Sequence, residues 1–213
     1  PILLRVTDYL AFRIKQINES FFKAINEVGY KGYYKGVFPV KVNQQAQVID
    51  RIVDFGKEYD FGLEVGSKPE LLIALAHDLS SESTIICNGI KDKEFINLAI
   101  LSLKIGFKTI LVLESPRELD LIIKVSQELN VKPLLGIRIK LTNKVSGNWS
   151  QSSGDRSAFG MSVEQVMKVI TKLKVNNYLD CLVLQHSHLG SQIPDIIEIR
   201  KATQEACRFY SEM

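Results

Sequence analysis

The sequence predicts an α/β protein whose parallel strands belong to an eight-stranded barrel, with about six of the eight strand–helix units present. Three observations predict this fold class. Segments typical of strands and of helices alternate six times along the 213 residues. The strands are apolar on one face and carry charged residues or glycines on the other. No strand is followed by the Gly-x-Gly-x-x-Gly pattern of an open dinucleotide-binding sheet.

The first elements are a helix, a strand and a second helix. We expect an amphipathic helix over residues 9–28, because apolar side chains recur there at helical spacing and Gly29 supplies a stop signal. A strand is expected over residues 33–42, where Lys41 stands in an otherwise apolar run. The next helix is expected over residues 45–55.

The later elements continue the alternation of strands and helices. The sequences Ser67–Glu70 and Ser115–Glu118 each combine a capping serine with a first-turn proline and a glutamate, which predicts a helix start. A long polar loop is expected over Thr142–Gly160. The remaining strands are expected over residues 59–65, 84–87, 109–113, 134–141 and 181–186. The remaining helices are expected over residues 67–79, 91–105, 115–129, 162–176 and 194–213.

Strand parity favours the barrel over an open sheet. Successive side chains of a strand point to opposite faces. In the second strand Leu63 and Val65 share one face and Glu64 lies on the other. A doubly wound sheet has helices on both faces, so its strands are apolar on both. A face that carries Lys41, Glu64 and Arg138 instead fits the interior of a TIM-type (β/α)₈ barrel near its C-terminal mouth, where active sites lie.

The length predicts an incomplete barrel. A complete barrel has eight strands and about 250 residues, whereas this chain has 213 residues and ends within an expected helix. We therefore interpret residues 1–213 as a truncated barrel domain of a longer protein. The first five strand centres recur roughly every 25 residues, the size of one strand–helix unit.

Composition excludes several classes of function. Hydrophobic residues make up 46% and charged residues 24% of the chain, and a net charge of +3 with mixed signs does not indicate a nucleic-acid or membrane partner. No apolar run approaches the length of a membrane span. The cysteines Cys87, Cys181 and Cys207 are few and far apart, which is typical of a reducing compartment. We expect a cytoplasmic protein.

Lys41 is the first candidate for chemistry. On its own run, the commoner interpretation is a lysine on the surface of an edge strand. The alternative is a lysine that the barrel encloses, and a neutral amine in an apolar interior is a nucleophile that can form a Schiff base. The charged inner face of the second and fifth strands favours the second interpretation.

The loop after the sixth strand supplies the matching groups. His188 has a flat ring for stacking or proton transfer, Gly190 lets the backbone approach a ligand, and Ser191 precedes an expected helix whose N–H groups can hold a phosphate. A Schiff-base lysine, a stacking ring and a phosphate-binding loop together suit pyridoxal phosphate, an electron sink for carbanions.

Four stretches resemble the fold-type III pyridoxal-phosphate decarboxylases, and among them the arginine decarboxylases. They are residues 37–45, 62–71, 87–92 and 186–192. The resemblance runs through the whole chain in order, and Asn88–Gly89 favours the arginine branch over the ornithine and diaminopimelate branches. The sequence departs from the family pattern at Gln185 and Ser187, where apolar residues are usual.

The resemblance implies a reaction and a set of site residues. L-arginine would lose its carboxylate to give agmatine and carbon dioxide, which supplies polyamine and spermidine biosynthesis. Lys41 would link covalently to the cofactor and His188 would stack on its ring, so both are the expected catalytic residues. The other expected cofactor contacts are Glu64, Arg138, Gly190 and Ser191.

The resemblance also implies what the chain lacks. Family enzymes use magnesium, for which the sequence shows no ligand cluster, and we expect a homo-oligomer, a dimer or a tetramer, for the full-length protein. A C-terminal β-domain completes the site in the family, so this fragment alone is expected to be inactive.

Two alternatives to a decarboxylase are considered: a barrel that binds pyridoxal phosphate without turnover, and a non-catalytic regulator. Retention of Lys41 and of His188–Ser191 argues against the regulator.

Overall fold

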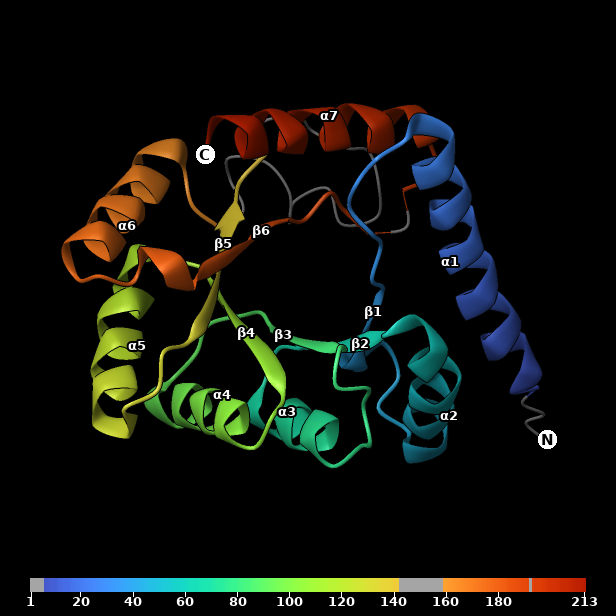
Figure 1. The fold of residues 1–213 in the computed structure, drawn as a ribbon, viewed down its shortest axis with the longest axis horizontal. Coiled ribbons are helices and arrows are strands. Elements are labelled where there is room, and N and C mark those ends of the chain that lie inside the picture. The colour runs from blue at the N-terminus through green and yellow to red at the C-terminus, as the bar shows by residue number, and fades with distance from the viewer. Residues whose placement is uncertain (1–5, 142–158, 192) are drawn as a thin grey trace. The chain divides into compact units, whose positions relative to one another are not determined.

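The computed structural model describes residues 6–141, 159–191 and 193–213, and it shows an α/β chain with parallel strands (Figure 1). The chain divides into two compact units. The first comprises residues 1–88 and 97–110, and the second comprises residues 89–96 and 111–213. Within the described ranges no helix is both long and apolar enough to span a membrane.

The first unit contains the first three strands and the helices between them. Its elements are α1 (Asp8–Val28), β1 (Val37–Pro39), the 3₁₀ helix η1 (Val40–Val42), α2 (Ala46–Gly56), the 3₁₀ helix η2 (Lys57–Tyr59), β2 (Gly62–Val65), α3 (Lys68–Leu75) and β3 (Thr84–Cys87).

Two elements cross from one unit to the other, and the rest of the chain belongs to the second unit. The crossing elements are α4 (Lys93–Lys104) and β4 (Lys108–Leu113). The elements of the second unit are α5 (Pro116–Leu129), β5 (Leu134–Ile139), α6 (Val163–Val175), the 3₁₀ helix η4 (Leu179–Cys181), β6 (Leu182–Ser187) and α7 (Ile196–Glu212).

The strands are neighbours in the order in which they occur along the chain, from β1 to β6. The pairs β1–β2, β2–β3 and β5–β6 are parallel, with Pro39 opposite Glu64 and Arg138 opposite His186. A doubly wound sheet reverses its strand order at a switch point, whereas a barrel does not. The observed order therefore agrees with the predicted barrel-type winding.

The first unit has an apolar core between α1, α2 and the sheet. Ile14, Val48, Ile52 and Phe61 are buried together. Where β2 meets β3, a Cβ atom added to Gly62 would lie 2.0 Å from the Thr84 carbonyl oxygen, so the two strands approach as closely as they do only because glycine stands there.

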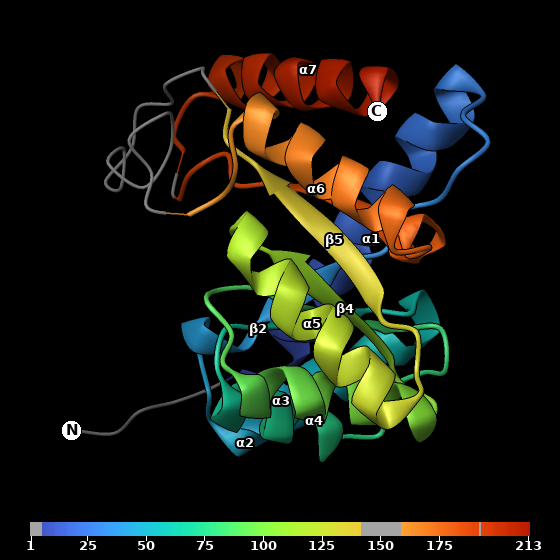
Figure 2. The same ribbon diagram turned by 90° about the vertical axis from the view of Figure 1, so that its left-hand side faces the viewer.

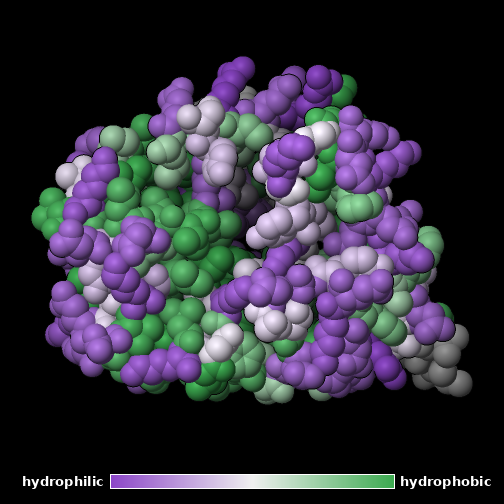
Figure 3. Space-filling view, in the orientation of Figure 1, coloured by the Kyte–Doolittle hydropathy of each residue, from purple (hydrophilic) through white to green (hydrophobic). Residues whose placement is uncertain are grey.

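In the second unit, α5 and α6 pack against each other, and α6 also packs against β5 (Figure 2). Figure 3 shows apolar side chains gathered where β6, α5 and α6 of this unit lie in Figure 1. Val183 of β6 is 52% exposed, although it lies in a strand. This exposure agrees with the position of β6 at one edge of the sheet.

The structure corrects the expected first strand. Residues 33–42 do not form one long strand, because β1 ends at Pro39 and η1 follows. Proline has no N–H to donate to a strand ladder. Lys41 therefore lies in a helical turn, and the parity argument that assigned it to the inner face of a strand is wrong.

The other boundaries agree to within a few residues, except that α3 ends at Leu75 rather than near residue 79. The expected cap at Ser67 is present, since its hydroxyl accepts from the Glu70 N–H at 3.4 Å. Ser115 makes no such side-chain cap. Most of the expected loop over Thr142–Gly160 lies outside the described residues.

Candidate functional site

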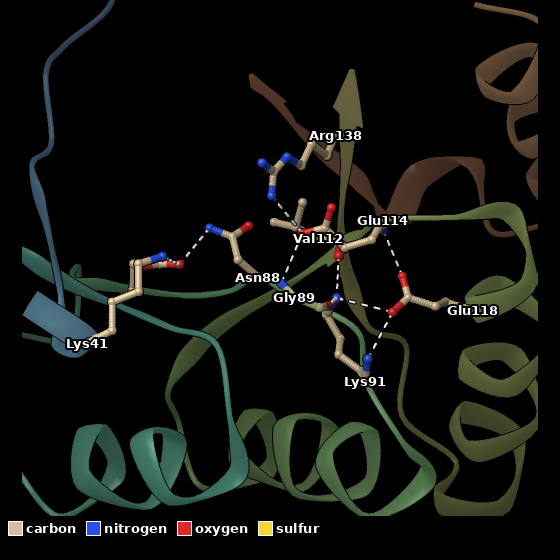
Figure 4. A network of polar contacts seen from close by, with 9 residues as sticks. Lys41, Asn88, Gly89, Lys91, Val112, Glu114, Glu118 and Arg138 are labelled. Atoms are coloured by element: carbon tan, nitrogen blue, oxygen red, sulfur yellow. Dashed lines mark hydrogen bonds and ion pairs between the residues drawn. The ribbon is translucent and has the colours of Figure 1, made fainter. Parts of the chain in front are cut away.

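A buried carboxylate, Glu64, organises the site in the first unit. It lies in β2, is 7% exposed, and accepts from two side chains on the same oxygen, Oε1. The Lys41 Nζ atom is 3.3 Å away and the Asn88 Nδ2 atom is 2.9 Å away (Figure 4). Three segments that are distant in the sequence thus meet at one charge.

Lys41 is not an enclosed lysine. Its side chain is 61% exposed, while its partner Glu64 is buried. The turn after β1 projects Lys41 from the end of the strand, so the amine is accessible to an aldehyde and is anchored by one ion pair. This differs from the expected desolvated lysine, but an accessible amine beside a fixed carboxylate still suits Schiff-base chemistry.

A second network in the second unit is centred on Glu114, the residue that follows β4. Its Oε1 atom accepts from the Gly89 backbone N–H at 2.9 Å and from Arg138 Nη1 at 3.0 Å. Arg138 lies in β5, and its guanidinium also stacks over the Phe159 ring, 5.4 Å from the centroid. Arg138 is therefore held from two sides.

The loop after β6 contains the other expected contacts. His188 follows the end of β6 and is partly buried. Gly190 has φ = 140°, in the region that L side chains rarely adopt, so glycine is required at this position. Ser191 is exposed.

Ser191 precedes a helix, as expected, but does not itself cap it. The following helix, α7, begins at Ile196, and its N-cap is Asp195, whose carboxylate accepts from the Ile197 N–H at 2.8 Å. The Asp195 carboxylate thus accepts from one of the free N–H groups at the start of α7.

The structure therefore brings some predicted residues together within each unit. Lys41 meets Glu64 in the first unit, and Arg138, His188, Gly190 and Ser191 all belong to the second. Asn88 belongs to the first unit and its Glu64 network, and Gly89 belongs to the second unit and its Glu114 network.

Sequence reasoning missed several of these polar residues. The sequence alone indicates Asn88 only as a family marker and Glu118 only as a helix cap, and it does not single out Glu114 or Lys91. A usable signal was the position of Glu114 directly after a buried strand, since the C-terminal ends of parallel strands gather functional groups.

Buried polar atoms that lack a hydrogen-bond partner among the described residues include Asn88 Oδ1, Glu114 Oε2, Gln185 Oε1 and Ser187 Oγ. Buried polar groups in native proteins are almost always paired, so such atoms indicate a ligand or a further segment. Pyridoxal phosphate has an aldehyde that can react with the exposed Lys41 amine, so this residue fits the cofactor. In the part of the chain that is described, no group of His, Cys, Asp or Glu could hold a metal ion.

Comparison with known proteins assigns the chain to a class. The family of pyridoxal-dependent decarboxylases, pyridoxal binding domain, matches residues 14–213. The chain belongs to this family, and its six strand–helix units are part of the family's TIM-type barrel.

Within this family, the chain is similar in sequence to biosynthetic arginine decarboxylases. The chain is 49% identical to the biosynthetic arginine decarboxylase of Prochlorococcus marinus (strain MIT 9301) over all 213 residues, which are 33% of that relative. It is 47% identical to the enzyme of the same name from Nostoc sp., over 100% of this chain and 31% of that one. The chain thus spans about a third of the length of these curated relatives.

Solved structures of decarboxylases also resemble this chain in fold. The biosynthetic arginine decarboxylase SpeA from Campylobacter jejuni superposes with a TM-score of 0.87 at 35% identity, covering 97% of this chain and 33% of that one. Diaminopimelate decarboxylase from M. jannaschi superposes with a TM-score of 0.77 at 24% identity, covering 95% of this chain and 45% of that one. The second match shows the shared fold alone.

Proposed function

We propose that this chain is the pyridoxal-phosphate-binding part of an arginine decarboxylase, which converts L-arginine to agmatine and carbon dioxide in polyamine biosynthesis. The observation that carries the proposal is the accessible Lys41 amine, held by the buried Glu64 carboxylate in a chain of this family. Because the chain spans about a third of its curated relatives, the proposal concerns the longer protein, and this segment alone is expected to be inactive.

The cofactor, when bound, supplies an electron sink for the charge left on the α-carbon as the carboxylate leaves. Lys41 provides the amine that attaches the cofactor. Glu64 fixes the position of that amine and balances its charge at 3.3 Å. Asn88 in turn donates to Glu64, which keeps the carboxylate oriented.

The second unit supplies the other proposed contacts. Arg138, anchored by Glu114, keeps further N–H donors that can bind polar groups of a ligand. His188 is proposed to lie against the cofactor ring. Gly190, with its positive φ, and Ser191 are proposed to contact the phosphate through N–H and hydroxyl groups.

The decisive experiment is to trap the cofactor on the full-length protein. The protein is incubated with pyridoxal phosphate, reduced with borohydride and digested, and the modified peptide is mapped. We expect the adduct on Lys41, its loss in Lys41→Ala, and its retention in Lys57→Ala, a control lysine on η2. An unmodified Lys41 would refute the assignment.

Substrate choice is tested by measuring carbon dioxide released from arginine, ornithine and lysine. We expect release from arginine to dominate. Equal or greater release from ornithine would refute the arginine assignment, and an adduct on Lys41 without release from any substrate would identify a barrel that binds the cofactor without turnover.

Three further properties complete the proposal: a magnesium requirement, a homo-oligomeric state and a cytoplasmic location. The widely separated cysteines support the location. Activity after chelation and light scattering of the full-length protein test the first two.

A further inference from the structure

A completely buried lysine, Lys91, lies beside the Glu114 network of the second unit and has no role in the proposed chemistry. Its side chain is 0% exposed. The ammonium donates to the Gly89 carbonyl at 2.6 Å and to the Val112 carbonyl at 2.5 Å, and the Glu118 Oε1 atom lies 3.5 Å away. Two carbonyl hydrogen bonds and one ion pair thus compensate the buried ammonium.

Glu118, the buried partner of Lys91, uses both of its oxygens. Oε1 accepts from the Lys91 backbone N–H at 3.0 Å, and Oε2 accepts from the Glu114 backbone N–H at 2.7 Å. One carboxylate therefore ties the segment after β3 to the segment after β4 (Figure 4).

These contacts converge on Glu114. Glu118 fixes its backbone, and Gly89 fixes its side-chain Oε1 atom. The Gly89 carbonyl is itself held by Lys91. Both ends of Glu114 are thus positioned by the buried pair Lys91–Glu118, and Glu114 is the residue that anchors Arg138.

We propose that Lys91, together with Glu118, is a positioning residue that sets the orientation of Glu114 and, through it, of Arg138 toward the cofactor. Burying charged groups is costly unless they are paired and hydrogen-bonded, and an apolar pair of similar size often stabilises a core as well. A role in stability alone therefore explains this pair poorly. The proposal rests on the proposed function, because the ligand that Arg138 meets is taken to be pyridoxal phosphate.

The experiment measures the cofactor dissociation constant and, separately, the thermal midpoint of the apoprotein, in the full-length chain. Lys91→Met and Glu118→Gln are compared with Lys93→Met. Lys93 is two residues away, is half exposed and pairs with Glu128 at 3.1 Å. We expect the two buried variants to weaken cofactor binding about tenfold, as outer-shell substitutions do at other sites, and Lys93→Met to change it less than about twofold.

A double-mutant cycle separates positioning from general stability. If Lys91 and Glu118 act through Glu114, Glu118→Gln will have little further effect on cofactor affinity in a Glu114→Gln background, because residues that act in series are non-additive. Equal effects of Glu118→Gln in both backgrounds would overturn the proposal.

The remaining outcomes are also decisive. Wild-type affinity in folded Lys91→Met and Glu118→Gln proteins would overturn the proposal, and so would failure of both variants to fold, since the pair would then serve stability alone. If wild-type protein forms no adduct at Lys41, the proposed function fails. If wild type binds and the variants bind equally well, only the positioning role fails.

Discussion

At the scale of single residues, Glu64 is the charge on which the first half of the site depends. One oxygen accepts from both Lys41 and Asn88, and the carboxylate is buried while Lys41 is exposed. The Asn88 contact is the one shielded from solvent, because both of its partners are buried.

The substitution Glu64→Gln removes the negative charge of this side chain while almost preserving its shape, and so tests whether the charge is needed. Hydrogen bonds to charged groups are stronger than neutral ones, so the full-length variant should bind pyridoxal phosphate about tenfold more weakly. Glu58→Gln is the matched control, because Glu58 is exposed on η2. Equal cofactor affinities for the two variants, measured by absorbance titration, would contradict this role of Glu64.

The cysteines provide a residue-scale test of burial. Cys207 is exposed, whereas Cys87 and Cys181 are buried. Burial, followed by the nearby Asp180 carboxylate, raises the pKa of the Cys181 thiol, so less of it is the reactive thiolate at pH 8 than in an open thiol. We expect iodoacetamide to label Cys207 first in the native protein and all three after denaturation. Labelling of Cys181 as fast as Cys207 would contradict the described packing.

At the scale of elements, two helices with similar sequence starts behave differently. Ser162 forms a full capping box with Gln165, since its hydroxyl accepts from the Gln165 N–H and its own N–H donates to the Gln165 side chain at 3.0 Å. Ser115 makes no side-chain cap, and the Glu118 carboxylate accepts from the Glu114 N–H and lies beside Lys91.

Ser162→Ala and Ser115→Ala form a matched pair that tests this difference. Loss of a serine N-cap costs about 1 kcal/mol, so Ser162→Ala should lower the free energy of unfolding by about that amount. Ser115→Ala removes no cap and should change it by less than about 0.5 kcal/mol. Denaturant titration measures both values, and a larger cost for Ser115→Ala would show that the assigned caps are wrong.

At the scale of the whole molecule, the order of the strands is the main feature. The strand order follows the chain order, and β1 and β6 are the edges of the described sheet. Edge strands present unpaired backbone groups. The relatives that the chain matches are about three times longer, since it covers 33% of them. Cofactor binding and turnover are therefore questions for the longer protein.

Much of the fold and part of the site could be predicted from local signals. Alternating strand and helix patterns predicted the α/β class, and the Ser67 cap is present as expected. The motif around Lys41 pointed to the family that residues 14–213 match. The turn that carries Lys41 was not predicted, because one proline at the end of β1 outweighed the apolar run.

The sequence by itself determined the fold class, the family and the Lys41 candidate, because periodicity, capping and motif residues are local properties of the chain. Only the tertiary structure decided that Lys41 is exposed beside a buried Glu64, and that Lys91 and Glu118 hold Glu114. The physical reason is that burial and charge pairing depend on segments more than twenty residues apart, such as Lys91 and Glu118. Their approach is set by packing, which no local pattern encodes.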